Sequence, residues 1–278
     1  MDMRPLGRTG LRVSAIGLGT VKIGRTKGLK HPGAAPVLPS DEQATELIRT
    51  AAELGINLID TAPAYGRSEE RIGAIMAANN WFGGRDSWVV CTKAGEEFDD
   101  ETGISAHDFS PEAIRASVDR SLRRLRVDVL DVVLIHSDGR DEWILEQSGA
   151  LDALRDLKTA GKIRAVGAST KTVDGGFSAI RSTRGRADVV MLTYNPRDRE
   201  ELPVIQSAAL RSVGVLVKKA LVSGRLDHIT NRLAIDGPEA EDPAQAALRF
   251  ALARPGVSSV VVGTSRPEHL RTNAAAVR

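Results

Sequence analysis

Eight short apolar runs alternate with amphipathic stretches along most of the 278-residue chain. Short apolar runs bounded by turn residues indicate buried strands, and apolar residues at three- and four-residue spacing indicate helices with one covered face. Strands that alternate with helices pair in parallel, and eight such units close into a (β/α)8, or TIM, barrel of the α/β class. The expected strands lie at 13–20, 56–60, 88–93, 130–135, 163–168, 188–193, 214–218 and 257–262, and the expected helices lie near 41–54, 68–79, 111–125, 148–160, 172–182, 201–212, 243–253 and 267–276.

Several helix starts carry the capping residues that this pattern requires. Ser40 is followed three residues later by Gln43, which is the pattern of a capping box. Ser110 and Asp242 each stand before a proline, and a proline at the first helical position needs no backbone N–H. These signals predict where three of the helices begin.

The residues before the first long strand predict a short β-hairpin, because Gly7-Arg8-Thr9-Gly10 separates two short strand-like runs. We therefore expect one domain over residues 1–278, a TIM barrel with a short N-terminal β-hairpin. Residues 22–39 and 94–109 are expected to be loops over the barrel mouth.

A doubly wound dinucleotide-binding fold is the competing architecture. Its glycine fingerprint needs a third glycine at the position of Lys22, directly opening a helix. Gly17 and Gly19 lead instead into a long segment that contains glycine, proline and lysine residues. A single barrel therefore accounts better for the pattern.

Composition narrows the classes of function. The formal net charge is +2, with 42% apolar and 27% charged residues, which gives no reason to expect nucleic acid or a membrane surface as a partner. No apolar stretch reaches the roughly 20 residues of a membrane span, and the first residues have no secretory apolar core. The single cysteine, Cys91, lies inside an apolar run and is expected to be a buried filler. These features predict a cytoplasmic protein and leave its oligomeric state open.

Three of the expected strands end at residues that can hold or transfer a proton. These residues are Asp60, Lys93 and His136, and Tyr65 follows Asp60 by five positions. Parallel barrels carry their chemistry at the carboxyl ends of the strands. An acid, a phenol, an ammonium and an imidazole gathered at one mouth predict a proton-transfer site, and hence an enzyme.

Each of these residues also has a structural explanation. Asp60 alone could cap the following turn, and Tyr65 could be a packing residue in a loop. Lys93 and His136 are harder to explain in this way, because each ends a run that should be buried, where a charge without a partner is unfavourable. The four residues together favour catalysis.

The chain resembles the aldo-keto reductase family, which comprises nicotinamide-dependent carbonyl reductases built on such a barrel. The resemblance runs nearly end to end. It rests on Leu6-Gly7-Arg8-Thr9-Gly10-Leu11, on Asp60 with Tyr65-Gly66, on Lys93 and His136, on residues 161–169, on Tyr194-Asn195-Pro196, and on Val262-Gly263-Thr264-Ser265 with His269-Leu270 and Asn273. The four catalytic-type residues, in this order and at strand ends, make the combination specific.

The resemblance implies hydride transfer from a reduced nicotinamide to an aldehyde or ketone, or the reverse oxidation, with Tyr65 as the proton donor. An isolated tyrosine has a pKa of ~10, and a nearby Lys93 ammonium is expected to bring that pKa toward the working range. Asp60 is expected to pair with Lys93 and keep it charged. His136 is expected to donate a hydrogen bond to the carbonyl oxygen of the substrate.

The resemblance also implies a dinucleotide extended across the barrel mouth, and no metal. The positions that match cofactor contacts are Gly19, Thr20, Asp60, Ser169, Lys218, Leu221, Ser223, Leu226, Gly263, Thr264, Ser265, His269 and Asn273. Backbone N–H groups at a glycine-containing helix start suit a phosphate, although a plain helix cap also explains Gly263-Thr264-Ser265. NADP(H) is the favoured cofactor, and NAD(H) is the alternative.

Several positions depart from the family pattern. Thr170 and Met191 stand where asparagine and glutamine are common, and Lys218 replaces an aromatic residue that often stacks on the nicotinamide. His269 stands where an arginine often binds the 2′-phosphate, and Thr272 replaces a frequent glutamate. The missing positive charge is expected from one of three residues, Arg266, Arg271 or Lys219.

Two other functions compete with carbonyl reduction. The altered Met191 and Lys218 positions fit a dinucleotide-binding regulatory protein that senses redox state with little turnover. A barrel isomerase or lyase with Lys93 as a Schiff-base amine ranks last, because Asp60 would keep that amine protonated. The expected substrate is a small carbonyl compound or alcohol, and the loops around the mouth would decide which one.

Overall fold

The structure is a computed structural model that describes residues 1–28, 37–81, 84–181, 187–224 and 242–277. Eight parallel strands close into a barrel in the order β10-β11-β12-β3-β4-β5-β8-β9, which confirms the expected (β/α)8 fold. The barrel strands are β3 (Ile16–Gly19), β4 (Leu58–Asp60), β5 (Val89–Ala94), β8 (Leu130–His136), β9 (Ile163–Ser169), β10 (Val189–Thr193), β11 (Gly214–Lys218) and β12 (Val257–Gly263).

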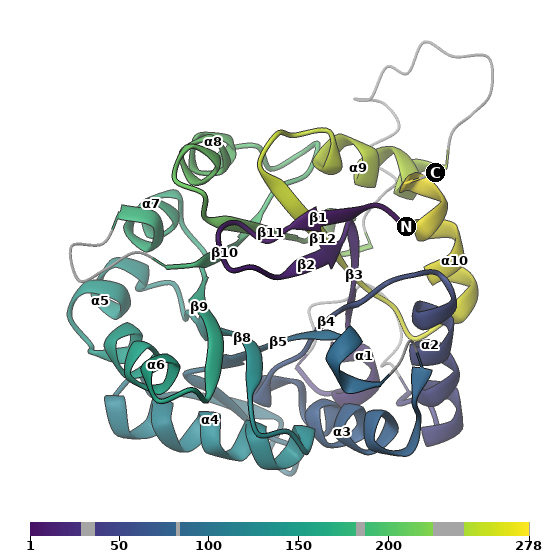
Figure 1. Ribbon diagram of the computed structural model, residues 1–278, viewed down its shortest axis with the longest axis horizontal. Helices are drawn as coiled ribbons and strands as arrows, with labels where there is room; N and C mark the ends of the chain where they lie inside the picture. Colours follow the sequence, from purple (N-terminus) through teal and green to yellow (C-terminus); the bar gives the residue numbers. More distant parts are fainter. Residues whose placement is uncertain (29–36, 82–83, 182–186, 225–241, 278) are drawn as a thin grey trace.

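Helices surround the barrel as an outer ring (Figure 1). The eight that sequence periodicity predicted are α2 (Asp41–Glu53), α3 (Ser68–Ala78), α4 (Pro111–Leu125), α6 (Ala150–Thr159), α7 (Val173–Arg181), α8 (Leu202–Leu210), α9 (Pro243–Leu252) and α10 (Pro267–Ala274). The capping box of α2 is confirmed, because Ser40 Oγ accepts from Gln43 N and the Gln43 side chain accepts from Ser40 N. Short 3₁₀ helices lie at η1 (Pro63–Tyr65), η3 (Arg85–Ser87), η4 (Val222–Gly224) and η6 (Ala275–Val277).

Aliphatic side chains fill the inside of the barrel. This inner cluster includes Leu58, Val89, Cys91, Val132, Leu134, Ala165, Val189, Met191 and Leu216, all of them buried. Residues that alternate with them along the strands, such as Val90 and Val133, belong to the larger cluster between the strands and the helices. Burying each valine or leucine contributes roughly 1.5–3 kcal/mol, so the barrel is a packed scaffold that holds its strand ends in fixed positions.

The N-terminal hairpin closes one end of the barrel. Strands β1 (Met3–Pro5) and β2 (Arg12–Ser14) pair antiparallel, as expected, and cross the barrel in Figure 1. Leu6 and Val13 join the inner barrel cluster. Arg4 Nη1 donates to the carbonyl oxygens of Leu252 and Val257, and Arg8 N donates to that of Ser212, next to the amino ends of β12 and β11. The carboxyl ends of the strands are therefore left for the site.

Three elements near the mouth were not predicted. Residues 94–109 were expected to be a loop, but they contain the antiparallel hairpin of β6 (Glu96–Asp99) and β7 (Ile104–His107). The run of acidic residues in this segment hides the strand pattern in the sequence. In the structure, Asp99 Oδ1 accepts hydrogen bonds from two backbone N–H groups and closes the turn. Short helices α1 (Val21–Gly24) and α5 (Asp141–Glu146) were also missed. The expected loop at 22–39 lies partly outside the described residues.

No helix in the described part of the chain is both long and apolar enough to span a membrane.

Candidate active site

Lys93 and Asp60 form a buried ion pair at the barrel mouth. They lie on the neighbouring strands β5 and β4, and Lys93 Nζ donates to Asp60 Oδ1 at 2.7 Å and to the carbonyl oxygen of Thr61 at 2.8 Å. Lys93 is 1% exposed and Asp60 is 3% exposed. Burial opposes the charged form and is the largest single effect, but Asp60, together with Tyr65 and Cys91, outweighs it and raises the pKa of Lys93 above its ordinary value. The amine is therefore held as an ammonium, as expected.

Tyr65 lies beside this ammonium, because η1 follows β4 directly and carries the tyrosine over the mouth. The Lys93 Nζ atom is 4.7 Å from the centroid of the Tyr65 ring. Burial raises the pKa of Tyr65 to about 12, even though the Lys93 charge lowers it. The expectation that Lys93 brings this pKa down toward neutrality is therefore not met, because desolvation of the phenolate is the larger effect. Tyr65 carries its proton at neutral pH.

The chain segments around Tyr65 hold it rigidly. Tyr65 N donates to the carbonyl oxygen of Ala62, and Arg25 Nη1 donates to that of Ala64. Helix α1 packs so closely that a Cβ on Gly24 would overlap the carbonyl oxygen of Tyr65. The short helix that the sequence pattern missed is thus part of the frame of the site.

His136 completes the group. Its ring lies edge-on to the Tyr65 ring, with 6.1 Å between the centroids. Nδ1 of His136 is 2.9 Å from Oε2 of Glu96, although its N–H is not well aligned with that oxygen. Burial lowers the pKa of His136, and the Lys93 charge lowers it further, while Glu96 opposes both. The imidazole is therefore neutral near pH 7.

Glu96 is a site residue that the sequence reasoning did not single out. Burial would raise the pKa of its carboxyl group, but contacts with His136 and Ser105 outweigh burial and lower it to about 2. Glu96 follows β5 after Gly95, whose φ of +102° turns the chain back over the mouth. A glycine directly after a strand was the available signal, but residues 94–109 were expected only to form a loop over the barrel mouth.

Of the expected cofactor positions at the ends of β3 and β12, Gly263 is exposed, whereas Gly19 is buried. Gly19 and Gly263 are register partners, and a Cβ on Gly263 would meet only the carbonyl oxygen of Gly19, at 3.9 Å. Next to them Thr264 is buried, and its Oγ1 accepts from the backbone N–H of Arg266 at the start of α10. Asn273 is also buried. An exposed glycine beside a helix start fits a phosphate-bearing ligand.

A second polar group lies at the ends of β9 and β11. Ser169 is the register partner of His136, and Lys218 Nζ donates to Ser169 Oγ at 2.9 Å and to the carbonyl oxygen of Thr170 at 2.7 Å. Thr170 is fully buried, and its Oγ1 has no partner among the described residues. Met191 instead packs inside the barrel. An orphaned buried hydroxyl next to the catalytic-type residues fits a ligand that carries an amide.

Other expected contacts are placed differently. Thr20 is fully buried, and its Oγ1 donates to the carbonyl oxygen of Asp60, so its side chain positions that residue. His269 is exposed on α10. Leu221 is half-buried before η4, which contains Ser223. Leu226 lies outside the described residues. Among those described, no group of three or more His, Cys, Asp or Glu is placed to hold a metal ion.

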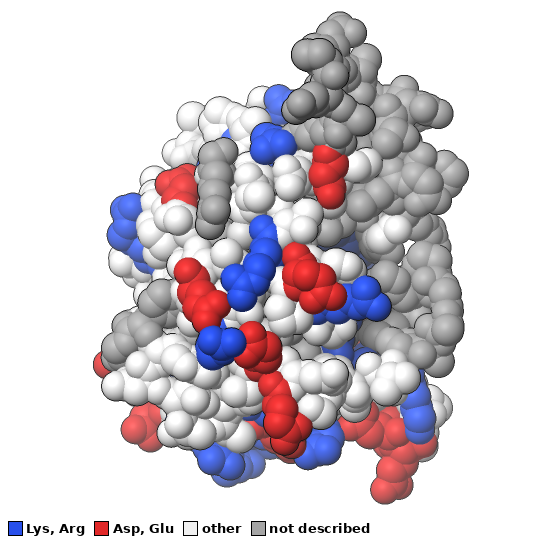
Figure 2. Space-filling model, turned by 90° about the vertical axis from the view of Figure 1, so that its right-hand side faces the viewer, with Lys and Arg blue, Asp and Glu red and all other residues white. Residues whose placement is uncertain are grey.

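A hollow of about 980 Å³ lies between the starts of α2 and α10. It is lined by Ser265 and Arg266 on one side and by Glu42, Gln43 and Glu46 on the other, among other residues. The nearby Lys22 has its pKa lowered by burial and by the positive charge of Arg266. Positive and negative side chains are interspersed on this face of the molecule (Figure 2). Neither Lys22 nor Arg266 forms an ion pair with a described residue.

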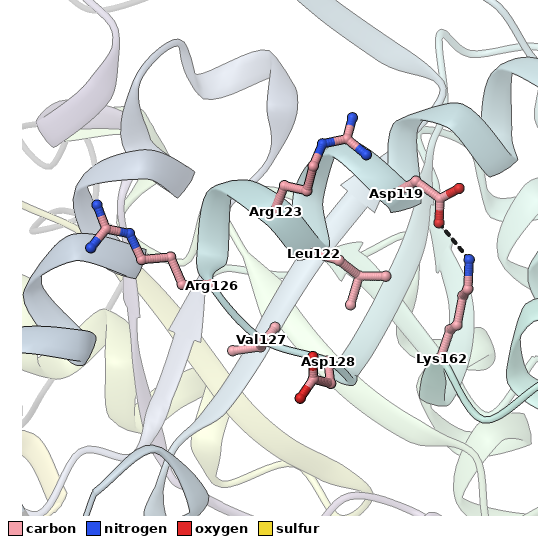
Figure 3. A pocket seen from close by; sticks show the side chains of 7 residues that line it. All are labelled: Asp119, Leu122, Arg123, Arg126, Val127, Asp128 and Lys162. Carbon is pink, nitrogen blue, oxygen red and sulfur yellow. Dashed lines mark hydrogen bonds and ion pairs between the residues drawn. The ribbon is translucent and has the colours of Figure 1, made fainter.

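Another hollow, of about 460 Å³, lies at the opposite end of the barrel, near the amino ends of β8 and β9. Figure 3 shows Asp119 and Lys162 pointing toward each other across it, and their ion pair measures 2.7 Å. Arg126 points away from this pair (Figure 3). None of the candidate catalytic residues lines this hollow, so it is separate from the site.

Comparison with known proteins agrees with this architecture. The model of the aldo/keto reductase family matches residues 15–278. L-Galactose dehydrogenase of Arabidopsis thaliana is 31% identical, over 100% of this chain and 88% of the relative. The NADH-specific methylglyoxal reductase of Escherichia coli is 29% identical, over 100% of this chain and 94% of the relative. A solved structure of a putative aldo-keto reductase from Pseudomonas aeruginosa superposes with a TM-score of 0.81 at 44% identity, over 99% of this chain and 95% of that one. With a family model that spans nearly the whole chain, this protein belongs to the aldo/keto reductase family of oxidoreductases.

Proposed function

We propose that this chain reduces aldehyde or ketone carbonyls to alcohols, or catalyses the reverse oxidation, as a single barrel domain that uses a nicotinamide dinucleotide. The observation that carries the proposal is the position of Lys93. Its Nζ bonds Asp60 on one side and faces the Tyr65 ring on the other, with His136 beside the same phenol. The set provides a proton donor, a fixed positive charge and an imidazole around one mouth.

The proton chemistry follows from these charges. The bound nicotinamide supplies the hydride that reaches the carbonyl carbon. Tyr65 donates its hydroxyl proton to the carbonyl oxygen, because an alkoxide that forms there is a much stronger base than a phenolate whose pKa is about 12. The Lys93 ammonium stabilises the phenolate that remains, and Asp60 keeps Lys93 charged. In the reverse direction the Tyr65 phenolate is the base, which favours oxidation at higher pH.

In this scheme His136 contacts the reacting oxygen, and its protonation state determines whether Nε2 donates or accepts the hydrogen bond. A carboxylate next to Nδ1 favours a proton on that nitrogen, so neutral His136 offers Nε2 as a hydrogen-bond acceptor. Only the protonated ring donates from Nε2 to a carbonyl oxygen. Neutral His136 therefore suits the alcohol hydroxyl, and the imidazolium suits the carbonyl.

NADP(H) is the cofactor that we propose. A 2′-phosphate is favoured by cations that lack carboxylate partners, and Arg266 and Lys22, near the start of α10, have none among the described residues. Of the other candidates for this role, Arg271 is 3.2 Å from Glu53 on α2, and Lys219 lies at the end of β11. The Escherichia coli relative, which is named for NADH, makes the opposite preference the natural alternative.

The direct test mixes the purified protein with NADPH or NADH and a panel of small aldehydes and ketones, while cofactor absorbance is followed. Carbonyl-dependent oxidation of the cofactor is expected, with the lower KM for NADPH. A lower KM for NADH would reject the cofactor choice alone. Cofactor binding without turnover of any carbonyl or alcohol would reject catalysis and favour a sensing role.

A further inference from the structure

Lys218 is a half-buried cation at the barrel mouth that has only neutral partners. Its Nζ donates to Ser169 Oγ and to the carbonyl oxygen of Thr170, and no carboxylate oxygen of the described residues lies within 4.0 Å of it. Lys93, in contrast, is neutralised by Asp60. Lys218 therefore has no direct carboxylate partner among the described residues of the mouth.

The groups around Lys218 bring the pKa of its ammonium group close to neutral pH. Burial lowers the pKa of Lys218 to about 7, helped by the charges of Lys219 at the end of the same strand and of Lys93 on β5. Two acids act against this, Glu201 before α8 and Asp141 on α5. Glu201 is itself buried, which raises its pKa to about 7. The Lys218 charge also lowers the pKa of His136 on β8. Small changes of pH near neutrality thus change the charge of this corner.

Lys218 lies where its charge would act on a bound cofactor as well as on the substrate. Hydride transfer requires the nicotinamide ring to lie next to the carbonyl carbon, within reach of Tyr65 and His136. Ser169 is the register partner of His136, and Lys218 bonds Ser169 directly. A nicotinamide ring bound there would have Lys218, Ser169 and the orphaned Thr170 hydroxyl as the residues available to hold its carboxamide.

We propose, on the basis of the function proposed above, that Lys218 places a titratable positive charge beside the nicotinamide and thereby sets the relative affinity for the oxidised and reduced cofactor. The oxidised nicotinamide ring is positively charged, whereas the reduced ring is neutral and the rest of the dinucleotide is the same. Protonated Lys218 repels only the oxidised form. Below neutral pH the site then releases the oxidised cofactor more readily than the reduced cofactor, and above neutral pH it retains the oxidised form.

The test measures the dissociation constants of NADP⁺ and NADPH by calorimetry between pH 6 and 9, and compares their ratio. For the unmodified protein the ratio of the oxidised to the reduced constant is expected to fall by about tenfold as the pH rises. Lys218→Met is expected to give a low ratio at every pH, because the charge is gone. Lys218→Arg is expected to give a high ratio at every pH, because arginine stays protonated.

Two other lysines serve as matched controls, Lys219 next to Lys218 in the chain and Lys22 near Arg266. Lys219→Met is expected to keep the pH step and move its midpoint to higher pH, because a charge that lowers the pKa of Lys218 is removed. Lys22→Met, near Arg266, is expected to change both dissociation constants by the same factor, because both cofactor forms carry the same phosphates.

The contradicting outcomes are distinct. A step that persists in Lys218→Met and disappears in Glu201→Gln would assign the charge to Glu201 and overturn the proposal. Binding of both cofactor forms with a flat ratio in the unmodified protein would overturn it as well, and would leave the proposed function intact. Failure of both forms to bind would overturn the inference and the proposed function together.

Discussion

Oε2 of Glu96 lies 2.9 Å from Nδ1 of His136, so the imidazole at the barrel mouth faces a carboxylate from β6. The pKa of Glu96 is lowered to about 2, so the carboxylate is ionised across the working range of pH. A negative charge at this place favours a proton on Nδ1 and leaves Nε2 as an acceptor in the neutral ring. The expected donation from His136 to a carbonyl oxygen therefore requires the protonated ring.

Glu96→Gln tests this relationship without changing the shape of the side chain. Loss of the carboxylate removes the group that raises the pKa of His136, so the pH midpoint of carbonyl reduction is expected to move to lower pH. At neutral pH kcat is expected to fall by about tenfold or more. Steady-state kinetics between pH 5 and 9 provide both readouts.

Glu97→Gln is the matched control, because Glu97 on the same strand accepts from Ser117 Oγ on α4 and pairs with Arg120 of that helix rather than with His136. Its pH profile is expected to follow that of the unmodified protein. Equal profiles for both glutamine variants would show that Glu96 does not act through His136.

Acid stability provides a second test of the same contact. The pKa of Glu96 is lowered from 4.5 to about 2 in the folded protein, so the unfolded chain takes up this proton at a higher pH than the folded protein. The resulting stability is complete above pH 4.5 and is lost as the pH falls toward 2, and it amounts to at most about 3 kcal/mol. Denaturant unfolding is expected to show a shallower acid loss in Glu96→Gln. Parallel losses in both proteins would contradict the shift.

His136 adds to this trend in the same direction. Its pKa is below 6.5 in the folded protein, so the fold favours the neutral ring. The free energy of unfolding is therefore expected to begin to fall as the pH drops below 6.5. His136→Gln should remove that first part of the decline.

Lys93→Met is expected to lower the free energy of unfolding by about 3–5 kcal/mol, because it leaves the buried Asp60 carboxylate without its partner. Lys162→Met is the control, since Lys162 and Asp119 are also 2.7 Å apart but both side chains are 42% exposed. That exposed pair is expected to contribute only about 0–1 kcal/mol. Urea unfolding of both variants measures the difference. Similar small losses in both would mean that the Lys93 pair is not desolvated.

Gly24→Ala is expected to disturb the Tyr65 segment from outside the site. A Cβ at this position would overlap the carbonyl oxygen of Tyr65 and the backbone N of Ser68, so α1 or η1 must shift. A shift of about 1 Å can lower the rate by about a hundredfold. Kinetics together with circular dichroism would separate this effect from unfolding. Unchanged kcat would show that α1 does not position Tyr65.

Much of the fold was predictable because its signals are local. The apolar run at 130–135 and the capping box at Ser40 predicted β8 and the start of α2 correctly, since strand burial and helix caps depend on neighbouring residues. Helix α1 was missed because its four residues form less than two turns and leave no periodicity. The hairpin of β6 and β7 was missed because β6 is mostly acidic and β7 is mostly exposed, so neither shows the apolar run of a buried strand.

The candidate site was predictable where residues end strands. Asp60, Lys93 and His136 were expected at one mouth on that ground, and the structure brings them together with Tyr65. The balance between burial and charge was not predictable, because the pKa of Tyr65 depends on how completely the folded chain excludes water from the phenol. The contact between Glu96 and His136 likewise depends on the chain reversal at Gly95, and a glycine after a strand does not by itself specify which residue the next side chain will meet.

The most direct test of the central claim is the effect of Tyr65→Phe on single-turnover reduction of an aldehyde, measured together with the dissociation constant of NADPH. The variant keeps the ring that packs beside Lys93 and His136 and loses only the hydroxyl proton. The reduction rate is expected to fall by about a hundredfold to ten-thousandfold while the dissociation constant stays within a factor of about two. A variant that reduces the aldehyde at the rate of the unmodified protein would show that Tyr65 is not the proton donor.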